Sequence, residues 1–432
     1  MSPTDTAPVA LSAIEELPGS EALAARRRRA LERLADLPVP SPELEEWRYS
    51  PIDELDVDAH RPVTSRPSGD PAPILPDPVA GAAARLVLVD GFVAHVELGD
   101  SAAGVRIAVV DDETVDAPGS VVGVDADHFT VLAEAFSPEP VIVDVAASTV
   151  LDGPLVIDAV TSARPHPHLV APRVLIRVGR DAEIAVVERH TGADASPALV
   201  ASVTEIEVGD AARCRHLWLG LGGDGSWTVS TVAARVGRDA TFVGGGVGFG
   251  GRYARLRNVT RLVGRGATGD LRGLYVARGT QVLDFRTFHH HEAPDTNANL
   301  VFKGVVDDAA RSIYTGLIHI AHEGRNADAH QTNRVVKLSD DAFAESVPNL
   351  EIENNEVRCS HASAVGPIDA DQRFYIESRA VPPDEAELLV VRGFLADLVT
   401  ELPVAEIRPL VESLVDAALG ARSAPTTPEA ER

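Results

Sequence analysis

The sequence is poor in cysteine, aromatic and basic residues. Of 432 residues two are cysteines, Cys214 and Cys359, one is methionine, and Phe, Trp and Tyr together make up 4%. Two cysteines are too few for a disulfide framework and are typical of a reducing compartment. Lysine and arginine number 39 against 65 aspartates and glutamates, so the formal net charge is −26. A surface of this sign repels nucleic acid and anionic membranes, and we expect neither as a partner.

Targeting signals and nucleotide motifs are also not found. Met1 to Asp5 does not lead from a basic stretch into an apolar core, and no uninterrupted apolar run is long enough to span a bilayer. We therefore expect a cytoplasmic protein. The sequence has no phosphate-binding P-loop and no Gly-x-Ser-x-Gly string, and the glycine-rich segment 244–251 is not followed by a helix. This chain is not expected to hydrolyse ATP itself.

A repeated turn dominates the middle of the chain. From about residue 85, short Val- and Ile-rich segments alternate with turn residues, as strands do. The string Val-Gly-Arg-Asp-Ala at 178–182 returns in related form at 208–212, 236–240 and 263–267, with its glycines 30, 28 and 27 residues apart. A β-sandwich also has frequent turns, but a near-constant spacing of one turn type indicates stacked coils. The pattern predicts a mainly β protein, a right-handed parallel β-helix.

Helical patterns are expected on both sides of this solenoid. Glu21 to Asp36 is rich in good helix formers, and two amphipathic helices are expected from Pro382 and from Pro403. The C-terminal pair could cap an open end of the solenoid or form a docking surface. The predicted divisions are an N-terminal helical region with a disordered start and a Pro-rich linker (1–84), the β-helix core (85–378), the C-terminal helical region (379–422) and a disordered tail (423–432).

Cys359 and His361 are the first candidates for chemistry. They are two residues apart, and on a strand such residues point to the same face. A thiolate beside an imidazole suits zinc or iron. Two ligands do not close a metal site, so further ligands would come from elsewhere in the fold or from a second chain. The alternative is a structural pair, a buried thiol beside a hydrogen-bonded histidine.

Other histidines and the second cysteine have weaker patterns. His289 and His291 could share a strand face and chelate a metal, or they could belong to a polar loop that includes Pro294. Arginines flank Cys214 and could lower the pKa of its thiol, although a strand could equally bury this cysteine away from them. A further set matches no metal or hydrolase spacing and is explained by a polar ladder along a solenoid corner: His319, His322 and His330.

Several strings in the C-terminal part form a specific combination, although each alone would be weak. They are Pro348–Ile352, Val357–Ala362, Gly366–Asp369, Phe374–Arg379 and Gly393–Phe394. Together with Leu37–Pro40 and Glu46–Ser50 near the N-terminus, they resemble the SufB/SufD family of iron–sulfur cluster assembly proteins. The match is dense over about 280–400 and weaker before it. The Cys-Ser-His string resembles the SufD branch, because the SufB branch typically has a His-Glu-Ala string there and additional cysteines.

The resemblance implies a fold and a set of partners. It implies a parallel β-helix between helical end regions and a non-catalytic scaffold subunit of a SufB–SufC–SufD complex. His361 would face a SufB-like subunit and help to build a nascent iron–sulfur cluster, with Cys359 as the neighbouring thiol; Ala362 stands where the family usually has glycine. The C-terminal helices would bind a SufC-like ATPase, and Phe394, Leu410 and Leu414 are the expected contacts.

The isolated chain is expected to hold no stable cofactor. Whether it forms a homodimer, and whether the complex binds a flavin, stay open at this point. Two other functions also remain: a SufB-like cluster scaffold, which the low cysteine count disfavours, and a β-helix polysaccharide lyase. Enzymes of the lyase class are usually secreted, and the sequence shows no export signal.

Overall fold

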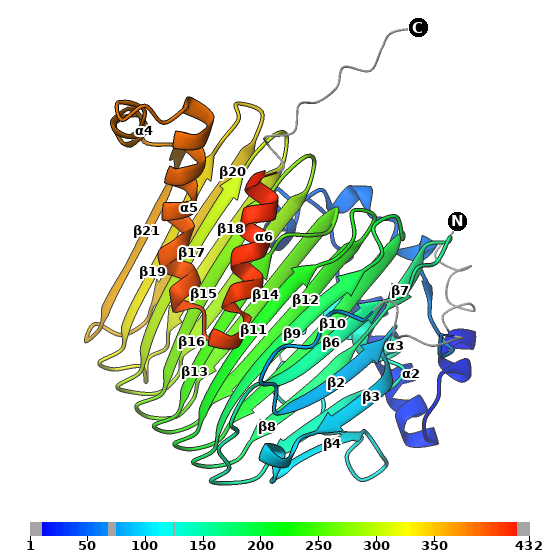
Figure 1. Ribbon diagram of the computed structural model, residues 1–432. Coiled ribbons are helices and arrows are strands. Elements are labelled where there is room, and N and C mark those ends of the chain that lie inside the picture. The colour runs from blue at the N-terminus through cyan, green and yellow to red at the C-terminus, as the bar shows by residue number, and fades with distance from the viewer. Residues whose placement is uncertain (1–10, 68–74, 124–125, 421–432) are drawn as a thin grey trace, which may run out of the picture.

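A computed structural model describes residues 11–67, 75–123 and 126–420 (Figure 1). It consists of one 11-stranded sheet and one 10-stranded sheet that form the two faces of a long parallel β-solenoid, with helices at both ends of the chain. The fold class expected from the repeated turn, a mainly β protein built as a parallel β-helix between helical regions, is confirmed. The expected disordered segments at the extreme N-terminus and over 423–432 lie outside the described residues.

We call the two sheets sheet A and sheet B. Sheet A contains, in spatial order, β20 (Phe343–Ile352), β18 (Arg311–Ile320), β16 (Val282–His291), β14 (Tyr253–Leu262), β12 (Trp227–Val236), β10 (Ala198–Val208), β8 (Arg173–Val178), β5 (Val141–Val145) and β4 (Val105–Val109), with β7 (His168–Val170) and β1 (Arg61–Pro62) beside this path. Sheet B contains β21 (Arg358–Pro367), β19 (Asp328–Lys337), β17 (Asn297–Val306), β15 (Thr268–Ala277), β13 (Thr241–Gly248), β11 (Arg213–Leu221), β9 (Glu183–Gly192), β6 (Leu155–Thr161), β2 (Ala84–Val89) and β3 (Phe92–Leu98). Strands from β8 onward alternate between the sheets, so each coil contributes one strand to each face.

The repeated turn forms a corner of the coils. Its fourth residue adopts a left-handed backbone in Asp181, with φ 58°, and in Asp239, with φ 54°. The glycine two positions earlier lies against the neighbouring coil: a Cβ on Gly264 would come within 2.0 Å of the Arg238 nitrogen. The amide of Gly209 donates to the carbonyl of Val178 at 2.9 Å, which joins one corner to the next. Glycine recurs in this turn because only a residue without a side chain permits such close stacking.

The interior of the solenoid, which we call the lumen, is filled by alternate residues of every strand. One column on sheet B passes in register through Cys214, Phe242, Ala298 and Ala329, all buried, and ends at Cys359. The lumen cluster is otherwise rich in Val, Leu, Ile and Ala. Small and branched side chains pack closely in a narrow space, so few aromatic residues are needed to fill it.

The N-terminal helices lie on the outer face of sheet A. Helix α2 (Glu21–Asp36) begins at Ser20, whose side chain accepts a hydrogen bond from the amide of Leu23, and it packs on α3 (His128–Phe136), which contacts β10. Three 3-10 turns come after α2, namely η1 (Glu45–Trp47), η2 (Ile52–Glu54) and η3 (Val57–Ala59), and a further one, η5 (Asp100–Ala102), lies between β3 and β4. The Trp47 ring is buried, and the Arg255 guanidinium lies 3.7 Å from its centroid, so a cation–π contact fastens this segment to the solenoid.

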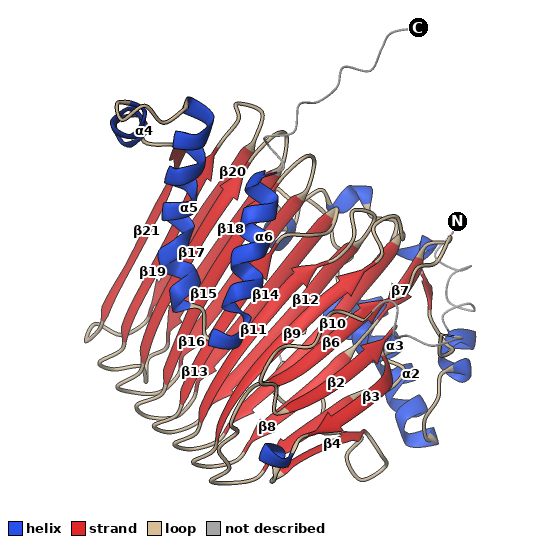
Figure 2. Cartoon of the chain, viewed as in Figure 1, coloured by secondary structure: helices blue, strands red, loops and turns tan. Residues whose placement is uncertain are grey.

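Helices α5 (Pro383–Glu401) and α6 (Arg408–Gly420) lie on the outer face of sheet B, with the 3-10 turn η7 (Ala405–Ile407) before α6 (Figure 2). The short helix α4 (Ala370–Glu377) precedes them and packs against α5. Buried side chains of α5 and α6, such as Leu395 and Val411, share one cluster with outward-facing apolar residues of sheet B, such as Leu219 and Leu274. Helices α5 and α6 therefore cover a face of the solenoid and do not cap its end. No helix in the described part of the chain is long and apolar enough to cross a membrane.

Candidate functional site at the open end of the solenoid

The last coil is the open end of the solenoid. Its strands β20 and β21 end their sheets, each paired with one neighbour, β18 or β19. Residues of β20 are mostly half-buried and residues of β21 are mostly exposed, whereas strands in the middle of the solenoid are largely buried. An uncovered sheet edge presents a row of backbone donors and acceptors that another chain can pair with. The open end is therefore suited to contact with another molecule.

Cys359 and His361 lie on one face of β21, as their spacing predicts. Cys359 is in register with Ala329, and His361 with Gln331, and both of these β19 residues are buried in the lumen. Cys359 is half-buried and packs against the lumen cluster, whereas His361 is exposed. The two side chains thus continue the lumen columns onto the last coil, which no further coil of the described chain covers.

The mouth of the lumen beneath them is polar. Ser346 of β20 accepts hydrogen bonds from the Asn333 amide at 2.8 Å and from the Ser363 hydroxyl at 2.7 Å, which join the two sheets. Gln331 is 1% exposed, and neither its Oε1 nor its Nε2 has a hydrogen-bond partner. Buried amide groups without partners are costly. The mouth therefore offers donors and acceptors to whatever covers it.

Burial raises the pKa of the Cys359 thiol, and the negative charge of Asp328 raises it further. At neutral pH this thiol is held in its protonated form. Since the thiolate is the metal-binding and nucleophilic form, Cys359 in the isolated chain is a poor nucleophile. A metal ion or a cationic group from another molecule would be needed to release its proton.

We expect both thiols to react slowly with iodoacetamide at pH 8. Cys359 should be alkylated severalfold more slowly in the native chain than in urea, and Cys214 more slowly still, because burial raises the pKa of the Cys214 thiol to about 12. Asp328→Asn removes the nearby negative charge and should speed labelling of Cys359 alone. Peptide mass spectrometry would measure each rate, and equal rates for Cys359 in the native and unfolded chain would contradict the expectation.

Cys359 and His361 do not form a closed metal site within this chain. Among the residues that the structure describes, no group of three or more His, Cys, Asp or Glu residues is arranged to hold a metal ion. A thiol and an imidazole side by side on an uncovered end could supply at most half of a metal site. Further ligands would have to come from a second molecule placed against the open end.

His289 and His291 share a face, but this face is the closed lumen. Both are fully buried on β16, so the polar loop considered from the sequence is not formed. Burial lowers the pKa of His289 well below the usual value and that of His291 to about 4, so both rings are neutral at pH 7. The Nδ1 atom of His291 lies 2.8 Å from Thr296 Oγ1, which links the ring to the following turn.

The remaining sequence candidates lie apart from the open-end pair. Cys214 is buried in the lumen, as expected if the strand turns it away from the flanking arginines. Burial raises the pKa of its thiol, and the charge of Arg215 only partly offsets this rise. His319 lies on β18, His322 is exposed in the turn after it, and His330 lies on β19 with its Nδ1 2.7 Å from Ser360 Oγ. His330 therefore lies on the outer side of the strand pair whose inner side carries His361.

A second polar cluster in the lumen has no counterpart in the sequence reasoning. The Glu188 carboxylate is 2.7 Å from His190 Nε2 and 2.9 Å from His216 Nε2, and all three side chains are buried. The Trp218 ring packs on His190 with centroids 5.8 Å apart. The two imidazoles lower the pKa of Glu188 against the opposing effect of its burial. In the sequence, the only sign of this cluster is the two-residue spacing of Glu188 and His190, which places both on one face of a strand. Their partner His216 belongs to the next coil.

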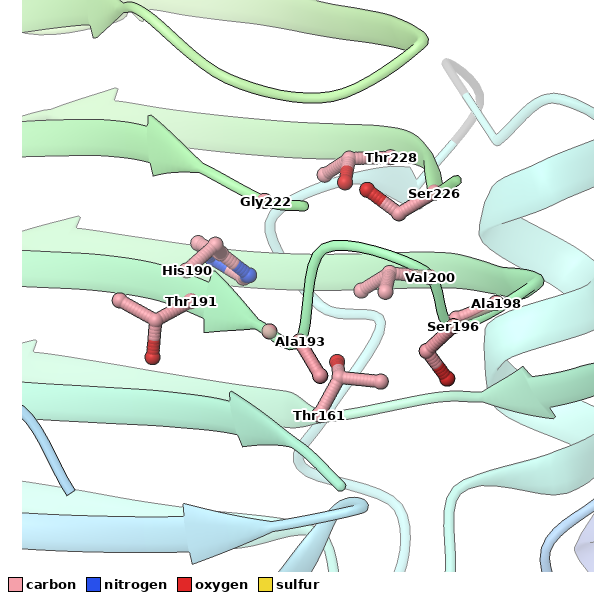
Figure 3. A pocket seen from close by; sticks show the side chains of 11 residues that line it. Thr161, His190, Thr191, Ala193, Ser196, Ala198, Val200, Gly222, Ser226 and Thr228 are labelled. Atoms are coloured by element: carbon pink, nitrogen blue, oxygen red, sulfur yellow. The ribbon is translucent and has the colours of Figure 1, made fainter. Parts of the chain in front are cut away.

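A small cavity adjoins this cluster at the end of β9 (Figure 3). It has a volume of about 10 Å³, and its lining includes His190 and hydroxyl side chains such as Thr161, Ser196 and Thr228. A space of this size holds about one water molecule. It is therefore too small to be a substrate site.

A larger groove lies beside the C-terminal helices. It has a volume of about 740 Å³ and is lined by residues of β17, α4 and α5, namely Lys303, Asp371, Gln372, Tyr375, Ile376, Leu389, Val390, Gly393, Phe394 and Asp397. Tyr375 is 59% exposed and Leu389 is 44% exposed. Of the predicted partner contacts, Phe394 lines this groove, whereas Leu410 and Leu414 are half-buried on α6. Sequence reasoning missed Tyr375 and Leu389, because helical periodicity alone does not show which face stays uncovered.

Comparisons with known proteins agree with this architecture. Residues 159–394 match the family described as SUF system FeS cluster assembly, SufBD core domain. A SufBD family iron–sulfur cluster assembly protein of Mycobacterium tuberculosis is 33% identical over 305 residues, which cover 68% of this chain and 75% of that protein. The iron–sulfur cluster assembly protein SufD of Escherichia coli is 25% identical over 377 residues, 86% of this chain and 87% of that protein. SufD of Bacillus subtilis is 37% identical over 159 residues, 37% of this chain and 36% of that protein.

The matched segment includes the open end, with Cys359 and His361, and reaches Phe394 in α5. It also includes most of the coils that carry the repeated corner. The resemblance seen in the C-terminal strings therefore extends over most of the β-helix, from residue 159 onward. The chain belongs to the SufB/SufD family of the SUF system of iron–sulfur cluster assembly.

Proposed function

We propose that this chain is a SufD-like, non-catalytic scaffold subunit that supports iron–sulfur cluster assembly where its open end meets a SufB-like subunit. The observation that carries the proposal is the pair of Cys359 and His361 on the uncovered last coil, next to the unpaired edges of β20 and β21. A second β-helix could pair with both edges and bring its own ligands to the mouth. The nascent cluster would then be cargo held between two chains.

The choice of a SufD-like over a SufB-like role rests on the number of thiols. Iron–sulfur clusters are held mainly by cysteine thiolates, with imidazole as a known substitute. This chain has two cysteines, and one of them, Cys214, is buried in the lumen with a thiol pKa raised to about 12. One accessible thiol and one imidazole fit an auxiliary half-site. A principal scaffold that assembles a cluster alone would need more ligands.

Copurification tests the proposal. A tagged chain expressed with its neighbouring SUF proteins should recover a SufB-like subunit and a SufC-like ATPase, and iron and sulfide should be found in the assembly. The isolated chain should contain no acid-labile sulfide. If the tagged chain recovers no such partners, or if it assembles a cluster alone, the proposed role is wrong.

The proposed ATPase contact is the groove between α4, α5 and β17. An exposed tyrosine and an exposed leucine at its rim, Tyr375 and Leu389, are typical anchors of a protein interface. Lys303 is held in place by Asp397 at 2.5 Å and by the Phe394 carbonyl at 2.8 Å, so the floor of the groove is preformed. A preformed groove with an exposed aromatic side chain at its rim suits a helix or loop of a partner.

We expect Tyr375→Ala combined with Leu389→Asp to weaken binding of the SufC-like ATPase by about 2 kcal/mol or more, the usual cost of removing interface anchors. Neither side chain is buried, so folding should be unaffected. Leu98→Asp is the matched control, because Leu98 is a similarly exposed leucine, 47% exposed, on β3 at the other end of the solenoid. Leu410→Asp tests α6 separately. Unchanged ATPase affinity in the double variant, measured by calorimetric titration, would place the interface elsewhere.

A further inference from the structure

A column of charged side chains crosses the outer face of sheet A. It follows the strand register through Asp144, Arg177, Glu207, Arg235, Arg261, His290, His319 and Glu351. Along its first part arginines pair with carboxylates, as Arg177 does with Asp144 at 2.6 Å and Arg235 with Glu207 at 3.5 Å. Near the open end this pattern changes, and two histidines face each other on β16 and β18.

The imidazoles of His290 and His319 face each other through their Nδ1 atoms. Nδ1 of His290 lies 3.5 Å from Nδ1 of His319, and the ring centroids are 5.6 Å apart. Two nitrogens in this position can share one proton, or both can direct lone pairs at one cation. In a tetrahedral site with metal–nitrogen bonds of about 2.05 Å, two ligand nitrogens are about 3.4 Å apart. The observed separation of 3.5 Å is close to this distance.

A carboxylate orients one of the rings. Glu353 Oε1 lies 3.3 Å from Nε2 of His319, on the far side of the ring from His290. When Nε2 donates to this carboxylate, Nδ1 of His319 is left as a lone pair directed at His290. A carboxylate behind an imidazole is the usual support of a metal-ligating histidine, because it fixes the tautomer and strengthens the ligand.

Acidic side chains lie near the pair, and solvent can reach it. Glu351 is the next residue in the column, and Glu292, two residues after His290, balances the charge of Arg261, which is in register with His290. The His319 side chain is 24% exposed and that of Glu353 is 58% exposed. A small hydrated ion can therefore reach the pair from solvent.

We propose that His290 and His319 form a binding site for a divalent first-row transition-metal ion, such as zinc, cobalt or iron(II), with water in the remaining coordination positions. Glu353 is its positioning residue. The site lies on the outer face of sheet A, apart from Cys359 and His361, which lie on the inner face of sheet B. Imidazole is a good ligand for these ions, and two imidazoles with water make an open, exchangeable site.

Titration of the metal-free full-length chain with cobalt(II) chloride, followed by its visible absorption, tests the proposal. The wild-type chain should bind Co²⁺, and Zn²⁺ should displace it. His290→Gln combined with His319→Gln should weaken binding at least tenfold, and Glu353→Gln should weaken it by about tenfold, the usual effect of losing such a support. His322→Gln is the matched control, since His322 is exposed in the turn after β18 and should leave binding unchanged.

Further variants distinguish metal binding at this site from metal binding at the open end. His361→Ala and Cys359→Ala should retain Co²⁺ binding, because neither residue belongs to the pair. If the double variant does not fold, as circular dichroism would reveal, X-ray absorption of the zinc-loaded wild-type chain decides, and two imidazole ligands are expected. The proposal is overturned if the wild-type chain binds neither Co²⁺ nor Zn²⁺, if the double variant binds as tightly as wild type, or if fewer than two imidazoles surround the zinc.

Discussion

Replacing His361 with alanine should lower the rate of cluster assembly by the reconstituted SufB–SufC–SufD complex about tenfold or more, the order expected when a ligand is lost from an incomplete metal site. His361 is exposed on the last strand, so its removal leaves no cavity in the lumen. The complex itself should form as in the wild type. In the proposed role the effect falls on assembly alone, because the imidazole would be a ligand to the cargo and is not a packing residue.

The controls for His361 come from the same pair of strands. His330→Gln changes an imidazole that is 51% exposed on β19 and faces the outer side, so it should leave the assembly rate unchanged. Cys359→Ser tests the neighbouring thiol. The rate would be measured by cluster absorbance and acid-labile sulfide after gel filtration of the intact complex. A wild-type rate in His361→Ala would remove this residue from the mechanism.

Cys359 is expected to matter less than His361, for a reason that lies in its environment. Its thiol has a raised pKa because it is half-buried and close to Asp328. The imidazole of His361 is exposed, so an incoming ion can reach it directly. Iron arriving from the partner's side would meet the histidine first and could then displace the thiol proton.

The fold could be predicted because a similar turn sequence recurs at the same corner of successive coils. The corner glycines, such as Gly209 and Gly264, are required where one backbone lies against the next, and so they recur at the coil length. That Cys359 and His361 lie on the same face of one strand followed from the alternation of side chains along a strand. Both inferences rest on local geometry, which the sequence specifies residue by residue.

What the sequence did not show depends on contacts between coils. His289 and His291 resemble a loop because Pro294 follows, but parallel pairing with both neighbouring strands holds them in β16 and turns them inward. The placement of α5 depends on outward apolar residues of sheet B, such as Leu274, which look like ordinary strand residues in the sequence. Neither result can be read from a helix or strand pattern considered alone.

The Glu188 cluster is the strongest example of a contact between coils that the sequence does not show. Its carboxylate binds His190 on the same strand and His216 on the next strand of sheet B, 28 residues away. Glu188→Ala should lower the free energy of unfolding by about 3–5 kcal/mol, because two buried imidazoles lose their common partner. Glu188→Gln should cost less, since an amide can accept from one ring and donate to the other. Urea unfolding followed by circular dichroism would measure both.

The pH dependence of these variants identifies the cause. The pKa of Glu188 is lowered in the folded chain, so its stabilising effect is complete above the pKa of an unfolded glutamate, about 4.3, and is lost as the pH falls further. The advantage of the wild type over Glu188→Gln should therefore be constant near pH 7 and shrink in acid. Glu207→Ala is the control: its side chain is 44% exposed, its Arg235 partner is 3.5 Å away, and its loss should cost less than about 1 kcal/mol. If Glu188→Ala lies within 1 kcal/mol of wild type, as the control should, the two histidines do not need the carboxylate and the lumen is held by its apolar packing alone.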